Sequence, residues 1–225
     1  MKKLFTMALV ALFALAANAQ IVSSRSESIQ RAPKNHTSQW YVRAGVGSVG
    51  ISGKEFKESK STFGYEVELG YQRFFNGADG AHLGFEFGIQ NRGCKFEVVD
   101  SYNYHNDTYT TKDNTFSTLQ LNVQPIFGWK IPVGAGFSVD PHVGVFFGYD
   151  LTGSMSENDD FDFGDYKDAG WNAFDAGMSF GVGAWYKNFN FDLKYKYSFT
   201  SAWEPEEADG CGNTNGFMVT VAYAF

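Results

Sequence analysis

The segment 217–225 constrains the fold of this chain more than any other. Large apolar residues alternate in it with smaller ones: Phe217, Val219, Val221, Tyr223 and Phe225. Because successive side chains of a strand point to opposite faces, these five residues share one face. The pattern predicts a β-strand whose larger face is entirely apolar. Transmembrane β-strands have this property because their alternate residues meet lipid and lumen.

The N-terminal residues predict a targeting signal. An apolar stretch at 4–16 follows two lysines and precedes a small-residue cleavage motif at 17–19, so we expect a secretory signal over residues 1–19. An uncleaved membrane anchor is the alternative, which the shortness of the stretch disfavours. The polar, aperiodic residues 20–39 are interpreted as a flexible periplasmic leader, and residues 40–225 as a single barrel domain.

Charge and composition exclude one class of partner. The whole chain has a formal charge of −7, and loss of the two lysines of the signal leaves 16 − 25 = −9. An acidic chain lacks the basic surface that nucleic acid requires. A share of 18% aromatic residues together with 25 glycines suits a barrel that is apolar outside and polar inside.

Period-two alternation continues through most of the chain and predicts seven further strands. We expect them at 40–52, 62–75, 81–99, 116–131, 137–151, 171–187 and 189–203. The connections alternate between short turns and longer segments, the longer ones at about 53–61, 100–115, 154–170 and 204–213. Outer-membrane barrels have short periplasmic turns and longer extracellular loops. The sequence therefore predicts an all-β fold, an eight-stranded antiparallel up-and-down transmembrane barrel of this kind.

The face opposite the apolar one carries nine charged side chains. They are Arg43, Glu66, Glu68, Glu86, Lys130, Asp140, Asp192, Lys194 and Lys196. A soluble eight-stranded barrel such as a lipocalin would have to bury these charges in its core and expose its aromatic residues to water. We therefore assign the nine charges to the lumen and the apolar face to lipid. Aromatic residues near the long loops are expected to form one interfacial belt: Phe63, Tyr149, Trp171 and Trp203.

The chain resembles the small outer-membrane β-barrel proteins of the OmpX, OmpA-transmembrane and PorT-like kind. The resemblance rests on the signal that ends in Ala-Asn-Ala-Gln, on the strand 119–125 (Leu-Gln-Leu-Asn-Val-Gln-Pro) and on the terminal Tyr223-Ala-Phe225. It implies the outer membrane of a Gram-negative bacterium, surrounding lipid and lipopolysaccharide, and a monomer. It also implies that Tyr223 and Phe225 form the signal read by the barrel-assembly machinery.

No catalytic, cofactor or metal site is predicted. His105 has Ser101 and either Asp107 or Asp113 nearby, but a polar surface loop has the same composition. The acidic segment 157–165 has the alternate spacing of a calcium loop, yet its glycine comes one place late and no glutamate follows at the required distance. We interpret both segments as solvated loops.

Cys94 and Cys211 are the only cysteines. An oxidising compartment permits a disulfide between them. Two free thiols are an equally good interpretation, because the sequence gives no Cα separation.

The predicted function follows from the size of the barrel. Eight strands leave an interior that side chains just fill, and we expect Arg43 to pair with Glu68 and Glu86 rather than to line a wide pore. We predict an outer-membrane barrel with a structural or loop-mediated binding role and no catalysis; the extracellular ligand is not predicted. A narrow or gated channel is the alternative, and a lipid-modifying enzyme is the third choice.

Overall fold

The computed structural model describes residues 38–53, 59–77, 79–103, 108–156, 170–203 and 211–225. The expected signal over 1–19, most of the leader, the acidic segment 157–165 and His105 all lie outside these residues. Within the described part of the chain, no helix is long and apolar enough to cross a membrane.

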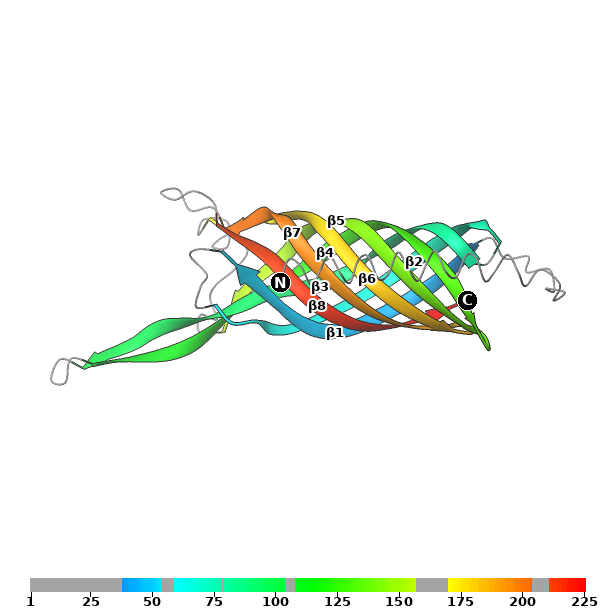
Figure 1. Cartoon of the computed structure of the whole chain (residues 1–225). Helices are drawn as coiled ribbons and strands as arrows, with labels where there is room; N and C mark the ends of the chain where they lie inside the picture. The colour runs from blue at the N-terminus through cyan, green and yellow to red at the C-terminus, as the bar shows by residue number, and fades with distance from the viewer. Residues whose placement is uncertain (1–37, 54–58, 78, 104–107, 157–169, 204–210) are drawn as a thin grey trace.

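Eight antiparallel strands form one closed barrel (Figure 1). They are β1 (Ser38–Ser52), β2 (Thr62–Asn76), β3 (Asp79–Asn103), β4 (Thr108–Gly134), β5 (Phe137–Met155), β6 (Phe174–Tyr186), β7 (Phe189–Trp203) and β8 (Cys211–Ala224). Each strand pairs with its neighbours in the sequence, and β8 closes the ring against β1. The predicted fold class is confirmed.

The two faces of each strand differ as the alternation requires. On β7, Phe191 and Leu193 are exposed on the outside, whereas Asp192 and Lys194 are buried inside. The other strands follow the same rule, so a continuous apolar wall surrounds a polar interior. Such a wall is stable only when lipid covers it, because a water-soluble monomer rarely exposes so large an apolar surface.

The strands β3 and β4 are longer than predicted. The expected loop at 100–115 is largely strand, because β3 runs to Asn103 and β4 begins at Thr108. The two strands form a hairpin that projects beyond the rest of the barrel (Figure 1). Outside the membrane neither face of a strand has to be apolar, so the alternation that marks the other strands is lost here. The threonines and tyrosines of the segment still favour an extended chain.

Two strand starts also differ from the prediction. β6 begins at Phe174 rather than at 171, and β8 begins at Cys211, inside the expected loop 204–213. The predicted short turns are present at the opposite end of the barrel. Between β4 and β5, Ala135 takes a left-handed φ of 50°, which tight hairpin connections require.

Candidate functional site: the lumen and its two ends

The nine charged residues assigned to the lumen all have buried positions in the barrel. Their exposed fractions range from 0% to 8%, for Arg43, Glu66, Glu68, Glu86, Lys130, Asp140, Asp192, Lys194 and Lys196. The question for function is whether these charges are paired with one another or solvated.

Two lysines of β7 hold the centre of the lumen. The ammonium of Lys194 lies 2.6 Å from a carboxylate oxygen of Glu68, 3.0 Å from Glu66 and 3.2 Å from Glu86. Lys196 lies 2.8 Å from Glu66 and 3.3 Å from Glu68. The carboxylates come from β2 and β3, so these ion pairs cross the lumen. They cross-link opposite walls of the barrel and occupy its middle.

Arg43 extends the same network. Its Nε lies 3.3 Å from Glu86 Oε1, and its Nη1 is paired with Asp192. The hydroxyl of Tyr41 donates a hydrogen bond of 2.7 Å to Glu86. The expected partner Glu68 lies directly opposite Arg43 in the β1–β2 register, but its carboxylate pairs with the two lysines instead.

A second group closes the periplasmic end. Asp140 accepts a hydrogen bond of 3.0 Å from the indole of Trp185, and His82 Nε2 lies 2.8 Å from the same carboxylate. The ammonium of Lys130 lies over the ring of Trp185 at 4.5 Å and over the ring of Phe74 at 5.5 Å. A cation over two aromatic faces at these distances is stabilised electrostatically, so this end of the lumen is filled as well.

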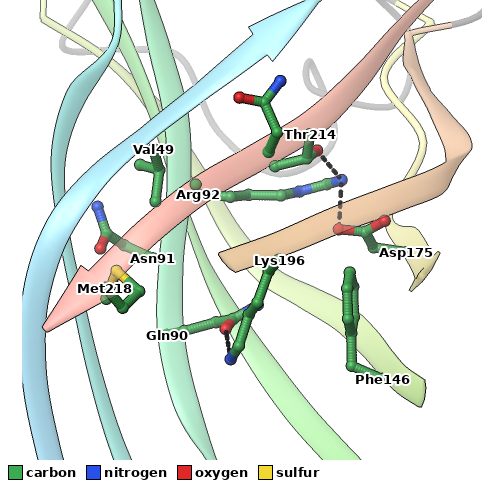
Figure 2. A pocket seen from close by; sticks show the side chains of 11 residues that line it. Val49, Gln90, Asn91, Arg92, Phe146, Asp175, Lys196, Thr214 and Met218 are labelled. Carbon is green, nitrogen blue, oxygen red and sulfur yellow. Dashed lines mark hydrogen bonds and ion pairs between the residues drawn. The ribbon is translucent and has the colours of Figure 1, made fainter. Parts of the chain in front are cut away.

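A third group lies nearer the extracellular end and was not singled out from the sequence. Arg92 Nε donates a hydrogen bond of 2.8 Å to Asp150. Figure 2 shows two further contacts of Arg92: its Nη1 lies 3.4 Å from Asp175 and 3.3 Å from the hydroxyl of Thr214. A cavity of about 20 Å³ lies beside Arg92 and Lys196, with room for about one water molecule. The alternation of the strands also places Arg92, Asp150 and Asp175 inside the barrel, so this group could have been predicted from the sequence.

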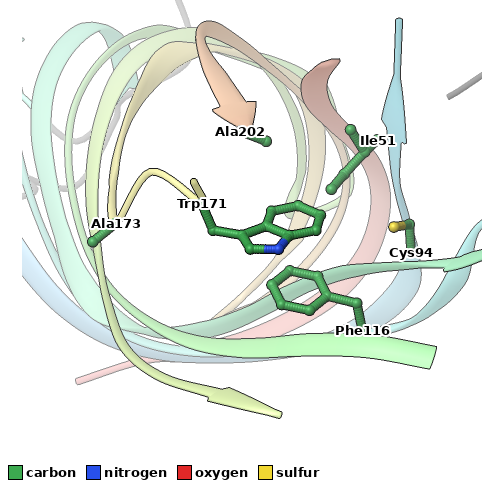
Figure 3. Close-up of a cluster of buried hydrophobic side chains, with 6 residues drawn as sticks. All are labelled: Ile51, Cys94, Phe116, Trp171, Ala173 and Ala202. Atoms are coloured by element: carbon green, nitrogen blue, oxygen red, sulfur yellow. The ribbon is translucent and has the colours of Figure 1, made fainter. Parts of the chain in front are cut away.

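An apolar cluster lies at the extracellular end of the barrel (Figure 3). Trp171 stacks on Phe116 with ring centroids 4.0 Å apart and planes at 14°. Ile51, Cys94, Ala173 and Ala202 complete the cluster. The prediction that Trp171 belongs to the lipid-facing belt is wrong, since its exposed fraction is 9%. Trp171 precedes the first residue of β6, so the alternation of that strand does not fix its direction.

The structure describes the side chain of only one of the two cysteines. Cys94 is buried in the apolar cluster. The side chain of Cys211 lies outside what the structure describes, although its backbone pairs with Trp203 of β7. In sheet order, β1 and β2 separate β8 from β3. Because the side chain of Cys211 is not described, the disulfide stays a prediction.

The C-terminal residues close the wall and face outward. Phe225 N donates a hydrogen bond of 3.0 Å to the carbonyl of Trp40. The side chains of Tyr223 and Phe225 are exposed on the lipid side. Among the described residues, no cluster of histidine, cysteine and acidic side chains has the arrangement of a metal site.

A closed antiparallel barrel with an apolar wall and a charged interior defines an integral membrane β-barrel protein. A family model described as outer membrane protein beta-barrel domain matches residues 18–204. The chain belongs to this family, and it is a protein of the Gram-negative outer membrane. No curated protein sequence matches it.

Several solved outer-membrane structures are similar to this chain. Neisserial surface protein A is 13% identical, with a TM-score of 0.44, over 84% of this chain and 100% of that protein. OprG of Pseudomonas aeruginosa is 13% identical, with a TM-score of 0.43, over 87% of this chain and 99% of that protein. The attachment invasion locus protein Ail of Yersinia pestis is 14% identical, with a TM-score of 0.41, over 84% of this chain and 100% of that protein.

Proposed function

We propose that this protein is a sealed, non-conducting and non-catalytic barrel that binds an extended polypeptide segment through its β3–β4 hairpin. The observation that carries the proposal is that, among the described residues, the outer edges of the projecting hairpin pair with no other strand. The proposal also includes a monomer, surrounded by lipid and lipopolysaccharide, whose residues Tyr223 and Phe225 are read during assembly.

The hairpin rises beyond its neighbours on both sides. The last backbone pairing of β3 with the segment before β2 joins Lys95 to Lys60. On the other side, Ser156 N donates the last backbone hydrogen bond, of 3.0 Å, to the carbonyl of Thr115. Among the described residues beyond these points, β3 and β4 pair only with each other.

Unpaired strand edges favour recognition of another strand. Each edge presents a row of backbone donors and acceptors with no partner in the described sheet. A two-stranded ribbon is only marginally stable in water by itself, so an added strand stabilises it. Binding proteins use such strand addition for extended peptides, with backbone hydrogen bonds giving affinity and side chains giving specificity.

The filled lumen supports the non-conducting part of the proposal. Three successive groups of side chains occupy the interior, around Lys130, around Lys194 and around Arg92. The Trp171 cluster adjoins the last of them, because Arg92 Nη2 donates a hydrogen bond to the carbonyl of Asn172, the residue between Trp171 and Ala173. Moving ions through this interior requires separating buried ion pairs, which costs several kcal/mol for each pair.

The hairpin proposal can be tested with a synthetic strand. A labelled peptide with the sequence of residues 108–114, a segment that adopts an extended conformation in β4, serves as the probe strand, and we expect it to bind an outer edge of the hairpin of the refolded protein in a fluorescence anisotropy titration. The same peptide methylated at alternate backbone nitrogens cannot form the ladder and should not bind. A variant with residues 98–112 replaced by Asn-Gly, so that a two-residue turn joins the cross-strand partners Glu97 and Asp113, should also lose binding. Equal binding of both peptides, or undiminished binding by the shortened variant, would refute the proposal.

A gated channel is the second candidate, and one observation favours it. Several buried side-chain oxygens of the lumen have no hydrogen-bond partner within the described structure: Asn122 Oδ1, Gln124 Oε1, Asp192 Oδ1 and Thr220 Oγ1. Buried polar atoms of this kind usually bind water. Water molecules bound along the lumen would provide a path for small solutes. Swelling of protein-loaded liposomes in small sugars would favour this candidate, and unchanged light scattering would count against it.

A further inference from the structure

Among the described residues of the barrel wall, one exposed charged side chain faces the lipid. Arg73 lies on β2 at an outward position between Tyr71 and Phe75, and it is exposed. The other exposed charged residues of the described structure lie elsewhere: Lys60 before β2, Lys112 and Asp113 in the projecting hairpin, and Lys187 in the turn between β6 and β7.

Arg73 differs from the other arginines of the described strands. Arg43 and Arg92 are buried and paired with carboxylates. Arg73 lies opposite Ser38 of β1 and Leu83 of β3 in the strand register. Its guanidinium has no ion pair with any described residue. Because no described residue pairs with this outward-facing charge, we look for its counter-charge in the membrane.

The depth of Arg73 identifies the membrane layer that it meets. The short turn after β2 follows three residues later, which places Arg73 near the periplasmic surface. Two residues of a tilted strand cover about 5 Å of depth, so Arg73 lies just inside the level of Phe75. The exposed rings of Phe75 and Trp40 mark the interface there. An arginine stem extends along such rings while its charged end reaches the headgroups.

We propose that Arg73 binds the phosphodiester of a glycerophospholipid in the periplasmic leaflet. The planar guanidinium presents paired N–H donors that match two phosphate oxygens. Beside it, Trp40 and Tyr71 lie directly opposite each other on β1 and β2, with ring centroids 4.9 Å apart. These rings provide an apolar surface for the glycerol backbone and the upper acyl chain, next to the cation that holds the phosphate.

An anionic phospholipid is the occupant that charge complementarity selects, because no acidic side chain of the described residues forms an ion pair with Arg73. Lipopolysaccharide phosphates belong to the opposite leaflet and cannot reach the short-turn end. The proposed site is independent of the lumen and of the hairpin. It therefore does not depend on whether the barrel conducts or binds a peptide.

The test is native mass spectrometry of the full refolded barrel titrated with phosphatidylglycerol and with diacylglycerol of the same chains. We expect the wild-type protein to retain phosphatidylglycerol in preference to the phosphate-free lipid. Arg73→Gln should weaken phosphatidylglycerol binding about fivefold, the usual contribution of one basic residue near an anionic membrane surface. Arg73→Lys should keep part of the affinity.

Lys187→Gln is the matched control. Lys187 is an exposed cation at the same end of the barrel, in the turn after β6, and its loss should leave the binding unchanged. Heat-dependent gel mobility confirms that each variant is folded. The proposal is overturned if diacylglycerol binds as well as phosphatidylglycerol, if Arg73→Gln binds like the wild type, or if Lys187→Gln weakens binding equally. The comparison of the two lipids uses only the wild-type protein, so it tests the proposal even if a variant fails to fold.

Discussion

Replacing Lys194 by methionine should lower the free energy of unfolding of the barrel by about 3–5 kcal/mol, the usual cost of removing one partner of a buried ion pair. The ammonium of Lys194 is fully buried among three carboxylates, at 2.6, 3.0 and 3.2 Å. Methionine has a similar volume, so the change leaves no large cavity. Lys196 still contacts Glu66 and Glu68, and Arg43 still contacts Glu86, which keeps the cost from rising further.

The assay is a urea titration of the protein refolded in lipid vesicles, followed by tryptophan fluorescence and by gel mobility. Lys187→Met is the matched control: it removes a lysine from an exposed turn and should change the stability by no more than about 0.5 kcal/mol. Adding Glu68→Gln to Lys194→Met removes one carboxylate from a cluster that has lost a cation. The double variant should therefore be more stable than Lys194→Met alone, which a double-mutant cycle measures as coupling.

A small effect would refute the reasoning. If Lys194→Met costs less than about 1 kcal/mol, the value typical of exposed ion pairs, the three carboxylates are hydrated. The lumen would then contain water where the structure places a closed network.

Three further predictions concern packing and the thiol. Gly70→Ala should destabilise the barrel by about 1–3 kcal/mol, because the added methyl would lie 2.1 Å from a ring carbon of Tyr41; in a Tyr41→Ala background the urea titration should show a smaller cost. Trp171→Ala should cost about 3 kcal/mol, at the low end for a buried aromatic residue, because it removes the stack on Phe116; an unchanged midpoint would contradict this. The Cys94 thiol is buried, so a thiol reagent should label it only after unfolding of the unreduced protein; failure to react even then would indicate a disulfide.

The membrane explains why much of the fold could be predicted. A strand that passes between lipid and lumen must keep one apolar face over its whole length, so its alternation is strict. β7 has the same bounds, Phe189–Trp203, in the prediction and in the structure. The same alternation predicted that the charged side chains point into the lumen, and this prediction required no information about neighbouring strands.

The features that depend on other strands could not be predicted in the same way. Glu68 is cross-strand from Arg43, but the stagger of the barrel brings it to Lys194 and Lys196, and alternation carries no information about stagger. Trp171 lies before β6, where no alternation applies. The top of the β3–β4 hairpin lies outside the membrane, where a strand loses the apolar face that identifies it.

Single-channel conductance of the refolded protein in a planar lipid bilayer tests the central claim most directly. Folding is established beforehand by heat-dependent gel mobility. The closed ion-pair network predicts no stable conductance at moderate voltage. A reproducible conductance from the folded barrel would contradict the account and would show that ions pass Lys194 and its three carboxylates.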